Sequence, residues 1–132
     1  MNLFPARLEA IQVHEGVSLL EFEASGTELT MVGLEPPRGL QRGDEVLLGV
    51  KATHLILSRT PAKETSLLNC LPVRCVKIVS GEILASVILA WQERELEAIL
   101  AKPALQRLSL REGEEIFALF QAAELSVIEG RS

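Results

Sequence analysis

The two halves of this 132-residue chain carry the same short segments in the same order, and this internal repeat constrains the fold more than any single motif. Residues 2–7 recur as residues 69–74, with Asn, Pro and Arg at the same places. Residues 40–46 recur as residues 110–116, at an offset that is larger by three. We therefore expect two related units, of which the second has gained three residues between the matching blocks.

Each unit is predicted to consist of short strands. Aliphatic and β-branched residues gather in short segments, and turn-forming residues separate them, as at 14–16, 25–26 and 36–39. The expected strands are 7–13, 17–23, 28–33, 45–51 and 54–58 in the first copy, and 73–79, 82–90, 95–100, 114–121 and 125–128 in the second.

One segment gives conflicting signals. Residues 93–108 are rich in helix formers, but Pro103 interrupts them and the repeat aligns 95–100 with a strand. We expect the repeat to prevail, with a short helix near 103–107. Five short strands and one helical turn per unit predict an all-β protein with a minor helical part, built as two tandem five-stranded barrels of the OB type.

The first unit is expected to span residues 1–58 and the second residues 67–130, with a linker at 59–66. The linker carries Pro, charged and hydroxyl side chains and no large apolar residue. An extended chain covers only about 3.3 Å per residue, so the linker is too short to act as a free tether. A unit of roughly 60 residues also buries a marginal core by itself. The two units are therefore expected to touch.

Composition excludes several classes of function. The chain has 13 Lys and Arg against 18 Asp and Glu, with four Phe, one Trp and no Tyr. This acidic balance and the lack of stacking rings argue against nucleic acid, and the charge argues against an anionic membrane surface. No secretory signal and no membrane-spanning segment is expected, so the predicted location is the cytoplasm. Cys70 and Cys75 are expected to be buried, reduced thiols that face opposite sides of one strand.

Catalytic and cofactor motifs are missing from the sequence. It contains no Gly-Lys-Ser/Thr phosphate loop and no Cys–His or Ser–His pair at suggestive spacing. His14 and His54 have no spacing typical of a metal site and are expected to be exposed or loop residues. We therefore expect neither an enzyme nor a cofactor.

Two short motifs carry a family resemblance. Lys51-Ala52-Thr53 is followed by a strand and then by Thr65-Ser66-Leu67-Leu68-Asn69. In this order, within a doubled β unit, they resemble the pair of molybdate-binding Mop (or TOBE) domains at the C-terminus of molybdate-transporter ATPases. The family also includes small molybdate-binding proteins and molybdate-responsive regulators.

The resemblance implies binding of molybdate or tungstate at interfaces between subunits or domains. It implies a homo-oligomer, with a dimer favoured, and a molybdate-transporter ATPase as a further partner. Storage, sensing and regulation of molybdate transport are the expected roles. A tetrahedral dianion needs many donors, which Lys51, hydroxyls and backbone N–H groups would supply. The implied oxyanion-binding residues are Lys51, Ala52, Thr53, Thr65, Ser66, Leu67 and Leu68.

Several positions depart from the family pattern. Leu68 stands where the family has Arg, while Gln121 and Ala123 stand where it has Lys and a hydroxyl. In the first copy the matching Thr-Ser stretch would precede Asn2. At most one kind of site is therefore complete. These departures motivate an alternative function, a non-catalytic dimerisation or interaction module with a degenerate oxyanion site that docks on a transporter ATPase. An OB-type nucleic-acid binder is a third and weaker hypothesis.

Other repeated residues have simpler interpretations. Asn2 and Asn69 are expected to close turns. Arg7 and Arg74 are expected to lie on the solvent face or to pair with a carboxylate.

Overall fold

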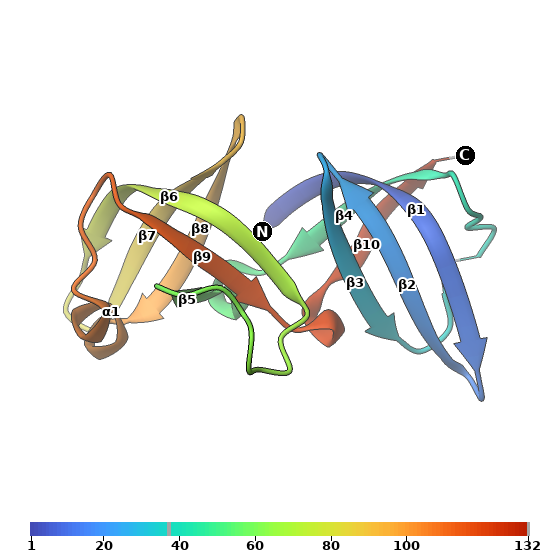
Figure 1. Ribbon diagram of the computed structural model, residues 1–132, viewed down its shortest axis with the longest axis horizontal. Helices are drawn as coiled ribbons and strands as arrows, with labels where there is room; N and C mark the ends of the chain where they lie inside the picture. The colour runs from blue at the N-terminus through green and yellow to red at the C-terminus, as the bar shows by residue number, and fades with distance from the viewer. Residues whose placement is uncertain (37, 132) are drawn as a thin grey trace.

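The computed structural model describes residues 1–36 and 38–131, and its strands pair antiparallel throughout (Figure 1). The first half comprises β1 (Asn2–His14), β2 (Val17–Ala24), β3 (Thr27–Gly33), β4 (Glu45–Val50), the 3₁₀ turn η1 (Ala52–His54) and β5 (Ile56–Ser58). The second half comprises β6 (Asn69–Ser80), β7 (Leu84–Trp91), β8 (Arg94–Ala101), α1 (Lys102–Leu108), β9 (Glu115–Phe120), the 3₁₀ turn η2 (Ala122–Glu124) and β10 (Ser126–Arg131).

These strands form two curled five-stranded sheets that exchange their last strands. The orders are β10-β4-β1-β2-β3 and β5-β9-β6-β7-β8. Each half therefore supplies four strands to its own sheet and the fifth to the sheet of the other half. The predicted class, mostly β with two five-stranded units, is confirmed. The division into 1–58, 59–66 and 67–130 stays a prediction about domains, since both sheets draw on both halves.

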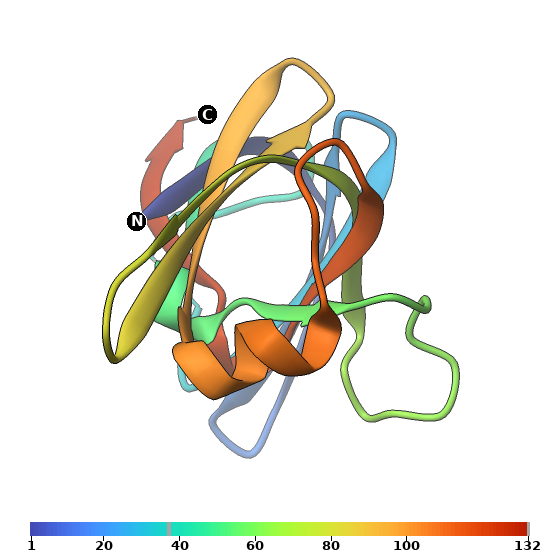
Figure 2. The same cartoon turned by 90° about the vertical axis from the view of Figure 1, so that its left-hand side faces the viewer.

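The strand register repeats residue by residue. β1 pairs with β4 from Asn2 opposite Val50 onward, and β6 pairs with β9 from Asn69 opposite Phe120 onward. The three extra residues of the second copy fall between β8 and β9, where α1 forms. Seen end-on, the second sheet curls round and α1 lies across one rim (Figure 2). The short helix and the strand before it, β8, were both predicted.

β1 and β6 begin earlier than expected, at Asn2 and Asn69 instead of residues 7 and 73. The predicted strand starts are too late because proline is unusual in a central strand, and the prediction therefore leaves Pro5 and Pro72 out of the strands. The register explains why proline is tolerated. At Pro5 the strand pairs with β4 alone, because pairing with β2 begins only at Arg7. The backbone of Leu8 bonds that of Asp44 and Gly43 on the β4 side, so by alternation the backbone of Pro5 faces away from β4. The missing N–H of proline therefore leaves no bond of the ladder unmade.

The turns follow the sequence prediction. The β1–β2 and β2–β3 turns are two-residue turns in which Glu15–Gly16 and Ser25–Gly26 have positive φ. Such turns match the twist of paired strands, and glycine adopts positive φ without steric cost. β5 begins at Ile56 instead of residue 54, because η1 takes up Ala52–His54. β10 begins one residue later than predicted and continues to Arg131 instead of ending at residue 128.

One hydrophobic core joins the two halves. The Phe4 ring, on β1, meets the edge of Trp91, on β7, at a centroid distance of 5.3 Å, and it stacks on Phe120 at 6.2 Å. All three side chains are fully buried. The core expected to be marginal in one unit is thus shared between two, as the size argument required.

Buried asparagines also join the halves. The Asn2 amide donates from Nδ2 to the Glu97 carbonyl (2.9 Å) and accepts at Oδ1 from the Glu97 N–H (2.7 Å). The Asn69 amide makes the same two bonds with Thr30, at 2.9 and 2.7 Å. Both Asn side chains are buried, so the expectation that they close turns is wrong. They act instead as clamps between one half and the edge strand of the other.

The cysteines face opposite sides of their strand as predicted, but only one of the two is buried. Both are free, and on β6 the Cys75 thiol is buried while Cys70 faces the other side and is half-buried. Burial raises the pKa of the Cys75 thiol. No helix in residues 1–36 and 38–131 is long and apolar enough to cross a bilayer.

Candidate oxyanion-binding loops

The first candidate loop follows β4 and carries Lys51, Ala52 and Thr53. Lys51 is extended and exposed, and its carbonyl accepts from the His54 N–H at 2.9 Å, which closes the turn η1. The buried Leu55 fixes the end of the loop in the core. Within the described residues the Lys51 ammonium has no hydrogen bond or ion pair. The loop therefore presents an uncommitted cation at the surface.

The second candidate segment precedes β6 and carries Thr65, Ser66, Leu67 and Leu68. The Leu67 N–H donates to Thr65 Oγ1 at 3.0 Å, a local turn of the kind that hydroxyl side chains stabilise. Ser66 is exposed, and its hydroxyl has no partner among the described residues. The Leu68 side chain is 62% exposed. The segment offers hydroxyls and backbone N–H groups but no cation.

Strand register places these two motifs beside different neighbours. Lys51 follows Val50, which is opposite Asn2, so the first loop lies beside the start of β1. Leu68 precedes Asn69, which is opposite Phe120, so the second segment lies beside Gln121. No hydrogen bond in the described part of the chain joins the two motifs. Their role in binding therefore remains a prediction.

A contact between η1 and η2 connects the two equivalent loops. His54 Nδ1 lies 2.9 Å from Glu124 Oε2, and both side chains are about one-third to two-fifths exposed (34% and 40%). The Nδ1 atom of His54 is buried and makes no hydrogen bond with the described residues. Its contact with Glu124 is therefore an ion pair when the histidine is protonated. His54 is thus a loop histidine as predicted, but no feature of the sequence indicated that Glu124 is its partner.

The linker is fixed to the second half at its start. Arg59 pairs with Glu114 (Nη1 to Oε2, 2.8 Å) and donates to the carbonyls of Leu108 and Ser109 at 2.8 and 3.0 Å. The hydrogen bond from Arg59, followed by one from the Arg111 N–H, lowers the pKa of Glu114, and the same pairing raises the pKa of Arg59. These contacts hold β5 and the beginning of the linker against β9.

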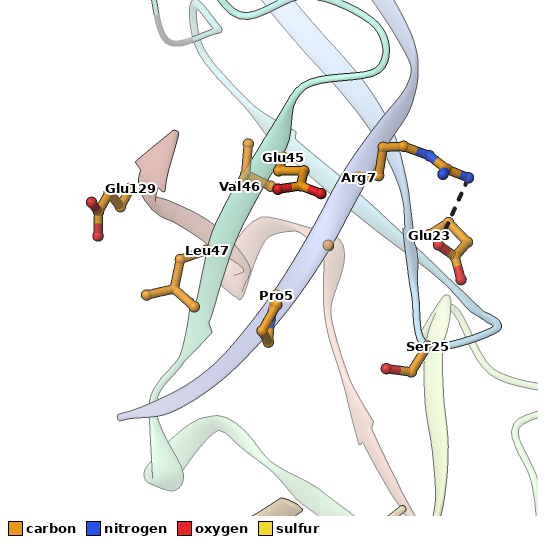
Figure 3. A pocket seen from close by; sticks show the side chains of 9 residues that line it. Pro5, Arg7, Glu23, Ser25, Glu45, Val46, Leu47 and Glu129 are labelled. Atoms are coloured by element: carbon orange, nitrogen blue, oxygen red, sulfur yellow. Dashed lines mark ion pairs between the residues drawn. The ribbon is translucent and has the colours of Figure 1, made fainter. Parts of the chain in front are cut away.

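Two surface grooves repeat the internal symmetry but lie apart from the loops. Their volumes are about 420 and 490 Å³. In the first, Arg7 lies 3.9 Å from Glu23 (Figure 3). It also lies 2.8 Å from Glu9, which confirms its predicted pairing with carboxylates. Arg74 lines the second groove at the equivalent position. None of the seven predicted oxyanion-binding residues lines either groove.

Comparisons with known proteins follow this geometry. No protein-family model matches the chain. A solved structure of the cytoplasmic molybdate-binding protein ModG, with molybdate bound, superposes with a TM-score of 0.88 at 26% identity, covering 96% of this chain and 94% of that one. The chain has the fold of tandem Mop domains. The resemblance stated from the two motifs and the tandem OB-like fold predicted from the repeat are both confirmed.

Two further similarities concern parts of larger or smaller proteins. The "Molybdenum import ATP-binding protein ModC" of Pasteurella multocida (strain Pm70) is 26% identical over 107 residues, which cover 76% of this chain. The matched part covers 30% of the length of that relative. A molybdate-binding protein from Sporomusa ovata is 27% identical and covers 51% of this chain and 100% of its own, with a TM-score of 0.49.

Proposed function

We propose that this chain binds molybdate or tungstate in the cytoplasm and serves storage, sensing or regulation of molybdate transport. The observation that carries the proposal is the match to ModG, which was solved with molybdate bound, over 96% of this chain. The proposal is of binding and not of catalysis, with the oxyanion as ligand and no cofactor.

The loops offer suitable chemistry for a tetrahedral dianion. Lys51 supplies a free positive charge, while Thr53, Thr65 and Ser66 supply hydroxyls at exposed positions. Backbone N–H groups around Ala52 would complete the set of donors, because charge-assisted hydrogen bonds are the strong ones. A dianion lacking such partners would not leave water.

We propose that a complete cage uses more than one copy of the chain. The lysine motif lies beside the start of β1, whereas the Thr65–Leu68 segment lies beside Gln121, which has no charge. A second copy could bring Lys51 of one molecule to Ser66 of another. This supports the predicted homo-oligomer, with a dimer favoured.

The alternative function, a degenerate interaction module docked on a transporter ATPase, also has an observation in its favour. Leu68 is 62% exposed where the family has Arg, and an exposed leucine suits a protein contact better than an anion. The similarity to part of ModC motivates the choice of partner.

Calorimetric titration with molybdate, tungstate and sulfate tests the proposal. Saturable binding of the first two is expected, and Lys51→Ala and Ser66→Ala should each abolish it. Lys77→Ala removes an exposed lysine of β6 and is the matched control, which should bind like the wild type. Absence of heat and of thermal stabilisation with every anion would reject oxyanion binding and favour the interaction module.

A further inference from the structure

We infer that Asn2 and Asn69 are positioning residues, which hold the oxyanion-binding loops against the opposite sheet without touching the anion. This inference rests on the proposed function and adds the residues that set the shape of the site. Asn69 is fully buried and Asn2 is 6% exposed, and each makes two hydrogen bonds to the backbone of one residue in the other half.

Each asparagine lies where a loop of the site begins. Asn2 is opposite Val50, and Lys51 is the next residue after Val50. Asn69 directly follows Leu68 and is opposite Phe120, the last residue before the η2 loop. A shift of either asparagine would therefore move a candidate loop with it.

Each amide also completes a ring of contacts around one loop. η1 packs against β8, and Asn2 bonds Glu97 within that strand. η2 packs against β3, and Asn69 bonds Thr30 within that strand. Each loop is thus held from two directions, by the strand that leads into it and by the edge strand on which it packs.

The chemistry of the clamp suits an edge strand. β3 and β8 are the last strands of their sheets, so their outward N–H and C=O groups lack a partner strand. A carboxamide has one donor and one acceptor side by side, and it takes the place of one residue of a partner strand. Both asparagines bond the backbone and not the side chain of their partner. The same pair of hydrogen bonds therefore forms in both halves, although Thr30 and Glu97 have different side chains.

Loss of the clamp should therefore reduce affinity more than a surface change would. Removing the amide leaves part-buried backbone groups without this partner and frees the loop on one side. Groups that orient metal ligands through hydrogen bonds typically contribute about tenfold to a hundredfold in metal affinity, and by analogy we expect an effect at the lower end of that range here.

The experiment compares Asn2→Ala and Asn69→Ala with a control that also breaks a bond between the halves. Gln92 Nε2 donates to the Ser25 carbonyl at 2.9 Å, but this bond is exposed and joins two hairpin turns. Calorimetry with molybdate, well below the unfolding temperature of each variant, should give about tenfold weaker binding for each Asn variant. Gln92→Ala should bind like the wild type.

A double-mutant cycle separates positioning from general loosening. The effects of Asn2→Ala and of a weakened lysine, Lys51→Gln, should be non-additive, whereas those of Gln92→Ala and Lys51→Gln should add. Wild-type affinity in folded Asn variants, or an equal loss in Gln92→Ala, would overturn the inference. If an alanine variant does not fold, Asn2→Ser and Asn69→Ser keep a hydroxyl for one of the two bonds and decide by the same comparison. A wild type that binds no oxyanion would instead reject the proposed function.

Discussion

His54 in the first loop lies 2.9 Å from Glu124 in the second, and the two residues hold the same place in the two copies of the repeat. The copies have therefore diverged in charge where they meet. The first loop combines Lys51 with His54, and the second combines Gln121 with Glu124. This asymmetry favours the first loop over the second as the place for an anion.

Glu124→Gln should strengthen molybdate binding, because it removes a negative charge that lies against the Lys51 loop. Interactions of partly exposed charges are small, so we expect a change of roughly twofold to fivefold that fades in high salt. Titration at two salt concentrations measures it. Glu82→Gln, between β6 and β7, removes the same charge far from the loop, and an equal gain there would contradict the explanation.

Glu114→Gln should make the free energy of unfolding depend less on pH in the acid range. The hydrogen bond from Arg59 lowers the pKa of Glu114 in the folded state, so the carboxylate stabilises the fold above its unfolded pKa, near 4.3. That contribution is lost as pH falls through the lowered value. The difference in unfolding free energy between wild type and variant should be steady above about pH 5 and shrink below it.

Urea denaturation from about pH 3 to about pH 7 checks this prediction. This range extends at least about one pH unit below and above the unfolded pKa of a glutamate side chain. Glu115→Gln is the control, since it changes a neighbouring exposed carboxylate that makes no ion pair within residues 1–36 and 38–131. A difference that grows toward low pH would contradict the assignment.

Phe4→Ala should destabilise both halves together. The ring is fully buried between Trp91 and Phe120, and truncating a core phenylalanine costs about 3–5 kcal/mol. Because the core is continuous, Trp91 fluorescence and far-UV circular dichroism should report one coincident transition, shifted to lower denaturant. Phe4→Leu, which keeps most of the volume, should lose less. Two separate transitions would show that the halves unfold independently.

Removal of residues 126–132 should expose a strand in the opposite half of the sequence. β10 pairs with β4, so its loss turns β4 into an edge strand. Hydrogen exchange at β4 should accelerate, while β9, which pairs with β5, should keep more of its protection. Equal acceleration in both strands would mean that the deletion acts globally.

Leu68→Arg should strengthen oxyanion binding by restoring the cation that the family has at this place. Leu68 is 62% exposed and lies beside the uncharged side chain of Gln121, so arginine would fit without entering the core. A charge-assisted contact to a dianion should increase affinity by about tenfold. Ile83→Arg adds the same charge at the other end of β6, and it should leave the affinity unchanged.

Much of the fold could be predicted because it repeats. The repeat placed β8 as a strand against its helix propensity, and the extra residues of the second copy form α1. The strand exchange could not be predicted, since β5 reads the same whether it pairs with β4 or with β9. Pattern specifies that a strand has a buried face but not which sheet receives it.

The candidate site was only partly accessible from sequence. Lys51 and Ser66 are identified by motif, and both are exposed as a binding role requires. The strand register shows that the two motifs lie beside different residues, which their spacing along the chain does not reveal. The clamps were missed because an asparagine at a strand end usually signals a turn. The repetition of Asn at residues 2 and 69 was the available signal, and it pointed to a structural need shared by both copies.

The exchange of β5 and β10 has a consequence for how this protein assembles. Two separate single-unit chains would have to meet in solution before either could trade a strand with the other. Here one covalent chain holds both partners, and the short linker keeps their effective concentration in the millimolar range or above. Strand exchange within one chain is therefore unaffected by dilution. The five-stranded sheets should persist at concentrations where assemblies of whole chains dissociate.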